Sequence, residues 1–142
     1  DSYAADKKVI TMALQVLPDY VPEFLRVSVG YLQACRDMDE CEKVMHQQVI
    51  PHIRRSFLHQ FEERLAKHYN HDETDIAELV LDVLAKGDEQ GSKINGSEMP
   101  RGYRQVLVKL QFDNFIIDGP DFTWCFSLKL LRQWWCASRG IA

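Results

Sequence analysis

Residues 51–65 read PHIRRSFLHQFEERL, and apolar side chains recur in this stretch at every fourth position. The members of this repeat are Ile53, Phe57, Phe61 and Leu65. Side chains spaced three or four residues apart lie on one face of an α-helix, so the stretch predicts a long amphipathic helix. Pro51 marks its start, because proline lacks a backbone N–H and is accepted in the first helical turn.

The N-terminal side of this stretch repeats the pattern. Apolar stripes at helical spacing run through residues 10–17 and 24–35, and they predict two further helices. Asp37 and Glu40 have the spacing of a capping box, in which each side chain bonds to the backbone of the other residue. A short helix should follow, and its predicted buried residues are Met38, Cys41, Val44 and Met45.

The C-terminal half also has helical periodicity. Residues 76–84 form an apolar face, and the polar segment 87–97 contains three glycines, which predicts a loop. Ser97 is placed to cap a helix whose apolar residues are Met99, Tyr103, Val106, Leu107 and Leu110. We expect a last, central helix that is apolar on more than one side and carries Phe122, Cys125, Phe126, Leu130, Leu131, Trp134 and Trp135.

The fold class predicted from these patterns is all-α. No stretch of useful length alternates apolar and polar residues as a half-buried strand does. Six or seven helices joined by short loops suit a HEAT-like stack of antiparallel helix pairs. We expect residues 1–20 to form an extra N-terminal helix in front of a main helical domain that covers residues 21–142.

The composition favours a protein-binding domain over a nucleic-acid-binding or membrane protein. Of the 142 residues, 46% are apolar and 27% are charged, which is typical of a globular domain. The net charge of −4 is dispersed, whereas nucleic-acid binding needs clustered lysines and arginines, so weak or no direct nucleic-acid binding is expected. No stretch approaches the roughly 18 apolar residues of a membrane span, and no signal peptide opens the chain. We therefore expect an intracellular monomer.

The candidate reactive side chains do not form a recognisable catalytic or metal site. Cys35, Cys41 and Cys125 fall on apolar stripes, and with Cys136 they are interpreted as reduced residues, a disulfide being the alternative. Cys35, Cys41 and His46 match no common zinc spacing. No serine or cysteine nucleophile motif accompanies the histidines. We therefore expect no metal, no cofactor and no enzymatic activity.

Several short segments together resemble the MA3 domain family. They are RDMDEC at 36–41, VIPH at 49–52, INGSEMPRGY at 94–103, IDGP at 117–120 and SRGI at 138–141. The resemblance covers about residues 22–142, with the extra N-terminal helix outside it. It implies a non-enzymatic helical module that docks on a DEAD-box RNA helicase of the initiation factor 4A class and regulates translation. The implied localisation is cytoplasmic, with the nucleus as a second site.

The resemblance also implies where a partner would bind. Asp118 matches the aspartate that faces basic residues of the helicase, and Pro120 belongs to the same turn. Asp113 and Asp121 would form an acidic rim around it, while Asn114 stands where helicase-binding members carry an acidic residue. Asp118 is equally suited to cap a helix, because Gly119 and Pro120 follow it. A scaffold domain of a nucleolar or splicing ribonucleoprotein factor, without helicase binding, is the alternative function.

Overall fold

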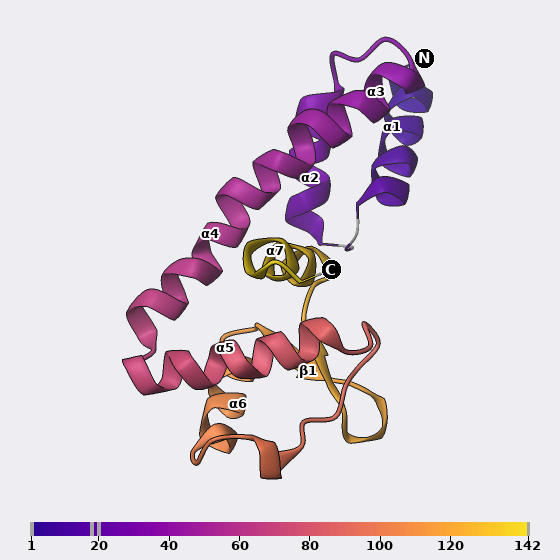
Figure 1. Ribbon diagram of the computed structural model, residues 1–142. Helices are drawn as coiled ribbons and strands as arrows, with labels where there is room; N and C mark the ends of the chain where they lie inside the picture. Colours follow the sequence, from indigo (N-terminus) through magenta and orange to yellow (C-terminus); the bar gives the residue numbers. More distant parts are fainter. Residues whose placement is uncertain (1, 18, 20, 142) are drawn as a thin grey trace. The chain divides into compact units, whose positions relative to one another are not determined.

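The computed structural model describes residues 2–17, 19 and 21–141, and these residues are mostly helical (Figure 1). The chain divides into two compact units, Asp1–Leu58 and His59–Ala142. Among the described residues, no helix combines the length and the apolar character needed to cross a membrane.

The first unit contains α1 (Ser2–Val16), α2 (Pro22–Leu32), α3 (Met38–Val44) and the start of α4 (Ile50–His68). The helix predicted within residues 1–20 is α1, although Pro18 and Tyr20 lie outside the described residues. Phe24 is buried in α2 and packs edge-on against Phe57 of α4, with ring centroids 4.8 Å apart. Ser28 is also buried, and its hydroxyl donates to the Phe24 carbonyl at 2.8 Å, so it leaves no polar atom unpaired.

A π-helical turn, Met45–Val49, connects α3 to α4. The N–H of Ile50 donates to the carbonyl of Met45, five residues back, which is the bond that defines this wider turn. Pro51 follows directly, in the first turn of α4. The predicted start of the long helix at Pro51 is therefore confirmed to within one residue.

The predicted cap at Asp37 is confirmed, with one difference in detail. The Asp37 carboxylate accepts a hydrogen bond from the N–H of Glu40 at 2.8 Å. The Glu40 carboxylate accepts from the N–H of Arg36 at 2.9 Å, one residue before the position that a capping box uses. Met38, predicted to be buried, is exposed at the start of α3.

The second unit contains the rest of α4, α5 (His71–Lys86), α6 (Tyr103–Phe112) and α7 (Lys129–Arg139). Asn70 begins α5 with a complete capping box, in which Asn70 and Glu73 each bond to the other's backbone. Helix α5 packs on both α6 and α7. The largest fully buried side chains of this unit include Leu81, Leu84, Leu110, Phe115, Ile116, Leu130 and Leu131.

The prediction for the last helix is wrong at its N-terminal end. Phe122, Cys125 and Phe126 lie outside α7, in or next to a two-stranded antiparallel hairpin of β1 (Ile116–Asp118) and β2 (Trp124–Phe126). Its register pairs Ile116 with Phe126, Ile117 with Cys125 and Asp118 with Trp124. Strands of three residues are too short to show an alternating pattern, so the apolar residues of β2 merged with the stripe of α7.

The predicted cap at Ser97 is also wrong. Asn95 takes this role at a short 3-10 turn, Gly96–Glu98, where its side chain accepts from the N–H of Ser97 at 3.2 Å. Helix α6 begins only at Tyr103, after Pro100 and after Gly102, which has a positive φ of 91°. Proline and a left-handed glycine both break a helix, and together they explain the later start.

Candidate functional site

The five predicted binding residues lie at two ends of the hairpin. Asp113 and Asn114 form the turn that leads from α6 into β1, whereas Asp118 ends β1 and Pro120 and Asp121 belong to the loop before β2. Asp118 and Asp121 line one open pocket of about 590 Å³, which also includes Gly119, Phe122, Thr123 and Trp124. The structure thus brings two of the three aspartates together at the hairpin tip.

Asn114 closes the C-terminus of α6 as a structural residue. Its φ is 64°, in the left-handed region. The N–H of Phe115 donates to the Leu110 carbonyl at 2.9 Å, and the N–H of Asn114 donates to the Gln111 carbonyl at 3.1 Å. This is the Schellman pattern of helix termination, which favours glycine or asparagine at the left-handed position. The backbone therefore explains the asparagine at a position where the resemblance leads one to expect an acid.

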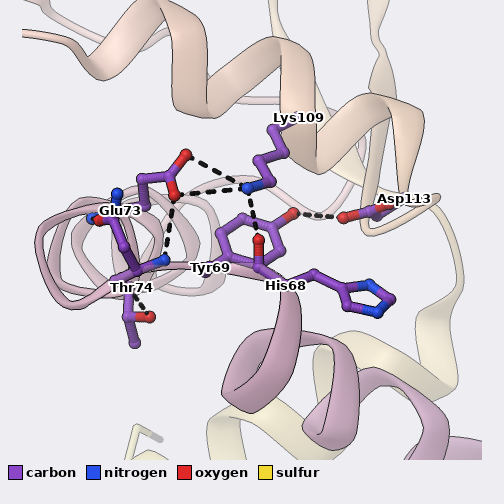
Figure 2. Close-up of polar contacts among 7 residues, drawn as sticks. His68, Tyr69, Glu73, Thr74, Lys109 and Asp113 are labelled. Carbon is purple, nitrogen blue, oxygen red and sulfur yellow. Dashed lines mark hydrogen bonds and ion pairs between the residues drawn. The ribbon is translucent and has the colours of Figure 1, made fainter.

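Asp113 is bonded within the second unit. Its carboxylate accepts a hydrogen bond from the Tyr69 hydroxyl at 2.8 Å, and Figure 2 shows these two groups pointing toward each other. Its backbone carbonyl accepts from the Arg64 guanidinium at 2.9 Å. Burial and this carboxylate raise the pKa of Tyr69 well above its usual range. Asp113 therefore ties the end of α4 to the end of α6.

Lys109 completes this junction. Its ammonium group lies 4.6 Å from the centre of the Tyr69 ring and 3.2 Å from the Glu73 carboxylate, and it also donates to the His68 carbonyl (Figure 2). The hydrogen bond from the Asn70 backbone and the bond from Lys109 lower the pKa of Glu73. All these groups have partners within the unit, so the junction is a structural network.

Asp118, in contrast, presents an exposed carboxylate. The Gln111 amide donates to the Asp118 carboxylate at 3.5 Å, which is a long and weak contact. The short turn Pro120–Phe122 begins after Gly119 and receives no side-chain cap bond, and α7 begins after Leu128. Asp118 therefore does not cap either of these helical segments, and its charge faces solvent.

The loop at the hairpin tip holds two residues in an unfavourable backbone conformation. Asp121 and Phe122 have φ of 55° and 61°, and the N–H of Thr123 donates to the Pro120 carbonyl at 3.2 Å. Two left-handed residues in a four-residue turn are the type I′ arrangement, which favours asparagine and glycine. A phenylalanine there is a rare exception, and the Phe122 side chain is 98% exposed.

A neighbouring loop holds this tip in place. Ser92 and Trp124 exchange two backbone hydrogen bonds, of 2.8 and 2.9 Å. A Cβ atom on Gly119 would lie 2.4 Å from the Thr123 hydroxyl and 3.2 Å from the Gln90 carbonyl, so a larger residue would require the Thr123 side chain to move. Strain that the surrounding structure maintains is a reason to suspect function, and Phe122 is the residue that the sequence did not reveal.

Exposed apolar side chains concentrate in the same part of the chain. Among the side chains that the structure describes, the three most exposed large apolar ones are Phe122, Phe112 and Val108, at 98%, 85% and 66%. Val108 and Phe112 lie four residues apart on α6 and therefore on one helix face. Ile117 of β1 is also exposed. Exposed apolar groups next to acidic ones are typical of protein-binding surfaces.

Comparisons with known proteins were made at three levels. No protein-family model, curated protein or solved structure matches the chain. The resemblance to the MA3 family therefore stays a prediction that depends on short motifs. Within the part of the chain that the structure describes, no group of three or more histidine, cysteine or acidic side chains is placed to hold a metal ion.

Proposed function

We propose that this chain is a protein-binding module whose hairpin tip docks on a basic surface of its partner. The observation that carries the proposal is the tip itself, where the exposed carboxylates of Asp118 and Asp121 accompany Phe122 in a strained, fully exposed position. Protein–protein interfaces are enriched in large aromatic side chains, which a polar rim surrounds.

The side chains of the tip indicate what kind of partner surface would bind them. An exposed carboxylate is well suited to a bidentate contact with arginine, which is stronger than a neutral hydrogen bond. Phe122 would enter an apolar pocket next to that arginine. The resemblance to the MA3 family points to a DEAD-box RNA helicase of the initiation factor 4A class, whose two lobes the module would hold in a fixed relation and thereby regulate translation.

The proposal includes the remaining parts of the MA3 resemblance. Helix α1 packs on α2, and α5 packs on α6, which supports a HEAT-like arrangement of consecutive antiparallel helix pairs. The module would act as a monomer in the cytoplasm, and also in the nucleus, without a cofactor or a catalytic step.

A binding titration against purified initiation factor 4A tests the proposal. The parent chain should bind, and Asp118→Asn should weaken binding because it removes charge while keeping the shape of the side chain. Glu62→Gln is the matched control, because Glu62 is an exposed carboxylate on α4 outside the hairpin. Equal losses in the two variants would show that only net charge matters. A parent chain that does not bind the helicase would favour the alternative of a ribonucleoprotein scaffold.

A further inference from the structure

An open groove lies between α1 and α3 in the first unit. The two helices pack on each other (Figure 1). The groove has a volume of about 490 Å³, which is typical of a ligand-binding pocket. Five of its lining residues belong to α1 and one to α3, namely Lys7, Lys8, Thr11, Met12, Gln15 and Met38. The hairpin tip belongs to the second unit, so this groove is a separate feature of the chain.

Two methionines form the apolar part of the groove. Met12 is 5% exposed and lies at its floor, whereas Met38, the first residue of α3, is 48% exposed at its edge. The exposure of Met38, which was predicted to be buried, leaves its side chain open to a partner. Methionine is flexible and polarisable, so it adapts to apolar groups of different shapes. The groove can therefore accept a large apolar side chain.

The polar part of the groove is basic. Lys7 and Lys8 are exposed, and the ion pairs of the described residues use neither of their ammonium groups. In the part of the chain that the structure describes, no carboxylate lines the groove. Lys8, Thr11 and Gln15 are three and four residues apart, so they follow one face of α1. The two lysines and the Gln15 amide thus supply hydrogen-bond donors along one wall.

The acidic side chains next to Met38 are engaged elsewhere. The Asp37 carboxylate accepts from the Glu40 N–H at 2.8 Å, and the Glu40 carboxylate accepts from the Arg36 N–H at 2.9 Å. Asp39 lines a separate hollow, together with Glu42, Lys43, His46 and Gln47. The groove is therefore a local basic feature of a chain whose net charge is −4.

We propose that this groove is a second docking site, which binds an acidic segment of a partner protein. A large apolar side chain of that segment would enter between Met12 and Met38, and carboxylates on either side of it would pair with Lys7 and Lys8. The charge of the groove selects this occupant, since it repels a basic surface of the kind that the hairpin tip would bind. The chain would thus contact two partner surfaces of opposite charge.

Other anionic partners fit the groove less well. A nucleic acid binds to clustered lysines and arginines and offers no apolar side chain to the methionines. An anionic membrane is bound by a continuous apolar helix face flanked by basic residues. Here the apolar floor is recessed, because Met12 is buried beneath the exposed lysines. A protruding side chain reaches such a floor, whereas a lipid surface does not.

A peptide titration on the full chain tests the proposal. The probe is a labelled synthetic peptide in which aspartates and glutamates flank a central leucine and phenylalanine, and binding is measured by fluorescence anisotropy. We expect this peptide to bind. One control peptide carries asparagine and glutamine in place of the acids, and another carries alanine in place of the leucine and phenylalanine. Both should bind more weakly, and equal binding of either control would overturn the proposal.

Variants of the chain locate the site. The double variant Lys7→Gln, Lys8→Gln should weaken binding of the acidic peptide about fivefold, because two exposed ion pairs are lost. The matched control is Lys43→Gln, Lys93→Gln, which removes the same charge from exposed positions outside the groove. Its affinity should equal that of the parent. Equal losses in the two double variants would show that only net charge matters, and the proposal would then be wrong.

The apolar part of the site has its own comparison. Met38→Gln should weaken binding of the same peptide, whereas Leu79→Gln should not, although the two side chains are 48% and 46% exposed. Amide chemical-shift changes on adding the peptide should concentrate on α1 and the start of α3. Changes centred elsewhere, or no binding of the acidic peptide, would overturn the proposal. Binding to phosphatidylserine vesicles without binding to the peptide would assign the groove to a lipid surface instead.

Discussion

Two acidic turns of this chain use their carboxylates for different purposes. At the start of α3, the carboxylates of Asp37 and Glu40 accept hydrogen bonds from backbone N–H groups at 2.8 and 2.9 Å. At the hairpin tip, Asp118 has one long contact of 3.5 Å from an amide, and its charge stays exposed. A carboxylate bonded to the backbone stabilises the fold, whereas a free carboxylate on a fixed loop is available to a partner.

The largest effect on stability should come from the base of the hairpin, where Phe115 precedes β1, and not from its tip. Phe115 is fully buried and packs on Phe61 at 5.0 Å between ring centroids. Phe115→Ala should lower the free energy of unfolding by about 3–5 kcal/mol, because it removes a large core side chain and leaves a cavity. Urea unfolding followed by circular dichroism measures this. An unchanged midpoint would mean that the hairpin is not anchored in the core.

The next effect concerns binding by the tip. Removing one member of a desolvated charge pair costs about 2–5 kcal/mol of binding free energy. Asp118→Asn should therefore weaken binding to initiation factor 4A by this order, while its unfolding curve stays that of the parent. Asp37→Asn should leave binding unchanged, because asparagine is as good a cap as aspartate. Equal affinities of Asp118→Asn and the parent would remove Asp118 from the binding surface.

The bond between Tyr69 and Asp113 offers a third comparison, because burial and this bond raise the pKa of Tyr69 and so make stability depend on pH. The folded chain keeps the Tyr69 proton at pH values where the unfolded chain loses it, since the pKa of Tyr69 is raised. This contribution is complete below about pH 10 and is lost above it, by about 1.4 kcal/mol per pH unit. Unfolding in urea between pH 9 and 11, values chosen to bracket about pH 10, should show a steeper decline for the parent than for Tyr69→Phe. Parallel declines would contradict the assignment.

The cap at Asp37 should have a smaller effect. Asp37→Ala removes the acceptor for the Glu40 N–H and should lower the free energy of unfolding by about 1 kcal/mol. Asp118→Ala, which breaks only the long contact with Gln111, should change it by less than about 0.5 kcal/mol. Thermal unfolding of the two variants side by side makes the comparison. A larger loss for Asp118→Ala would show that the hairpin aspartate is structural.

The smallest effect should be an increase in the free energy of unfolding. Phe122→Gly relieves the left-handed strain, which costs roughly 1–2 kcal/mol for other residues, but it also makes the unfolded chain more flexible. The net gain in stability should be about 0.5–1 kcal/mol, accompanied by weaker partner binding. Phe122→Ala keeps the strain and loses the ring, so it separates the two contributions. A variant less stable than the parent would mean that Phe122 is not strained.

The long helix and the cap at Asp37 could be predicted because their signals are local. The four-residue repeat from Ile53 and the pair Asp37 and Glu40 each lie within a few residues, and both are confirmed. The hairpin could not be predicted, because strands of three residues carry no detectable period. The partner of Asp113 is Tyr69, 44 residues away in the sequence, so no local pattern could distinguish this aspartate from Asp118.

The exposure of Phe122 is a second feature that the sequence concealed. Together with Cys125 and Phe126, this residue was predicted to belong to a buried stripe of the last helix. Its backbone is instead left-handed, and it lies two residues before Trp124, which pairs with Ser92 of a neighbouring loop. Such positions are determined by tertiary contacts, which explains why functional residues are those that local rules miss most often.

The π-helical turn between α3 and α4 affects which face of the helical segment carries the buried apolar side chains. Cys41, Met45, Val49 and Ile53 are all buried and four residues apart. Four residues of a regular α-helix turn by about 400°, which is about 40° more than a full turn. The row of buried side chains would therefore drift around the helix axis. A wider turn absorbs part of that drift. Because a π-helical turn holds one residue more than an α-helical turn, deleting the exposed Gln47 or Gln48 should restore a regular turn and leave the side chains on either side close to their present register. Deleting a residue within a regular α-helix instead rotates the side chains after it in that helix by about 100°.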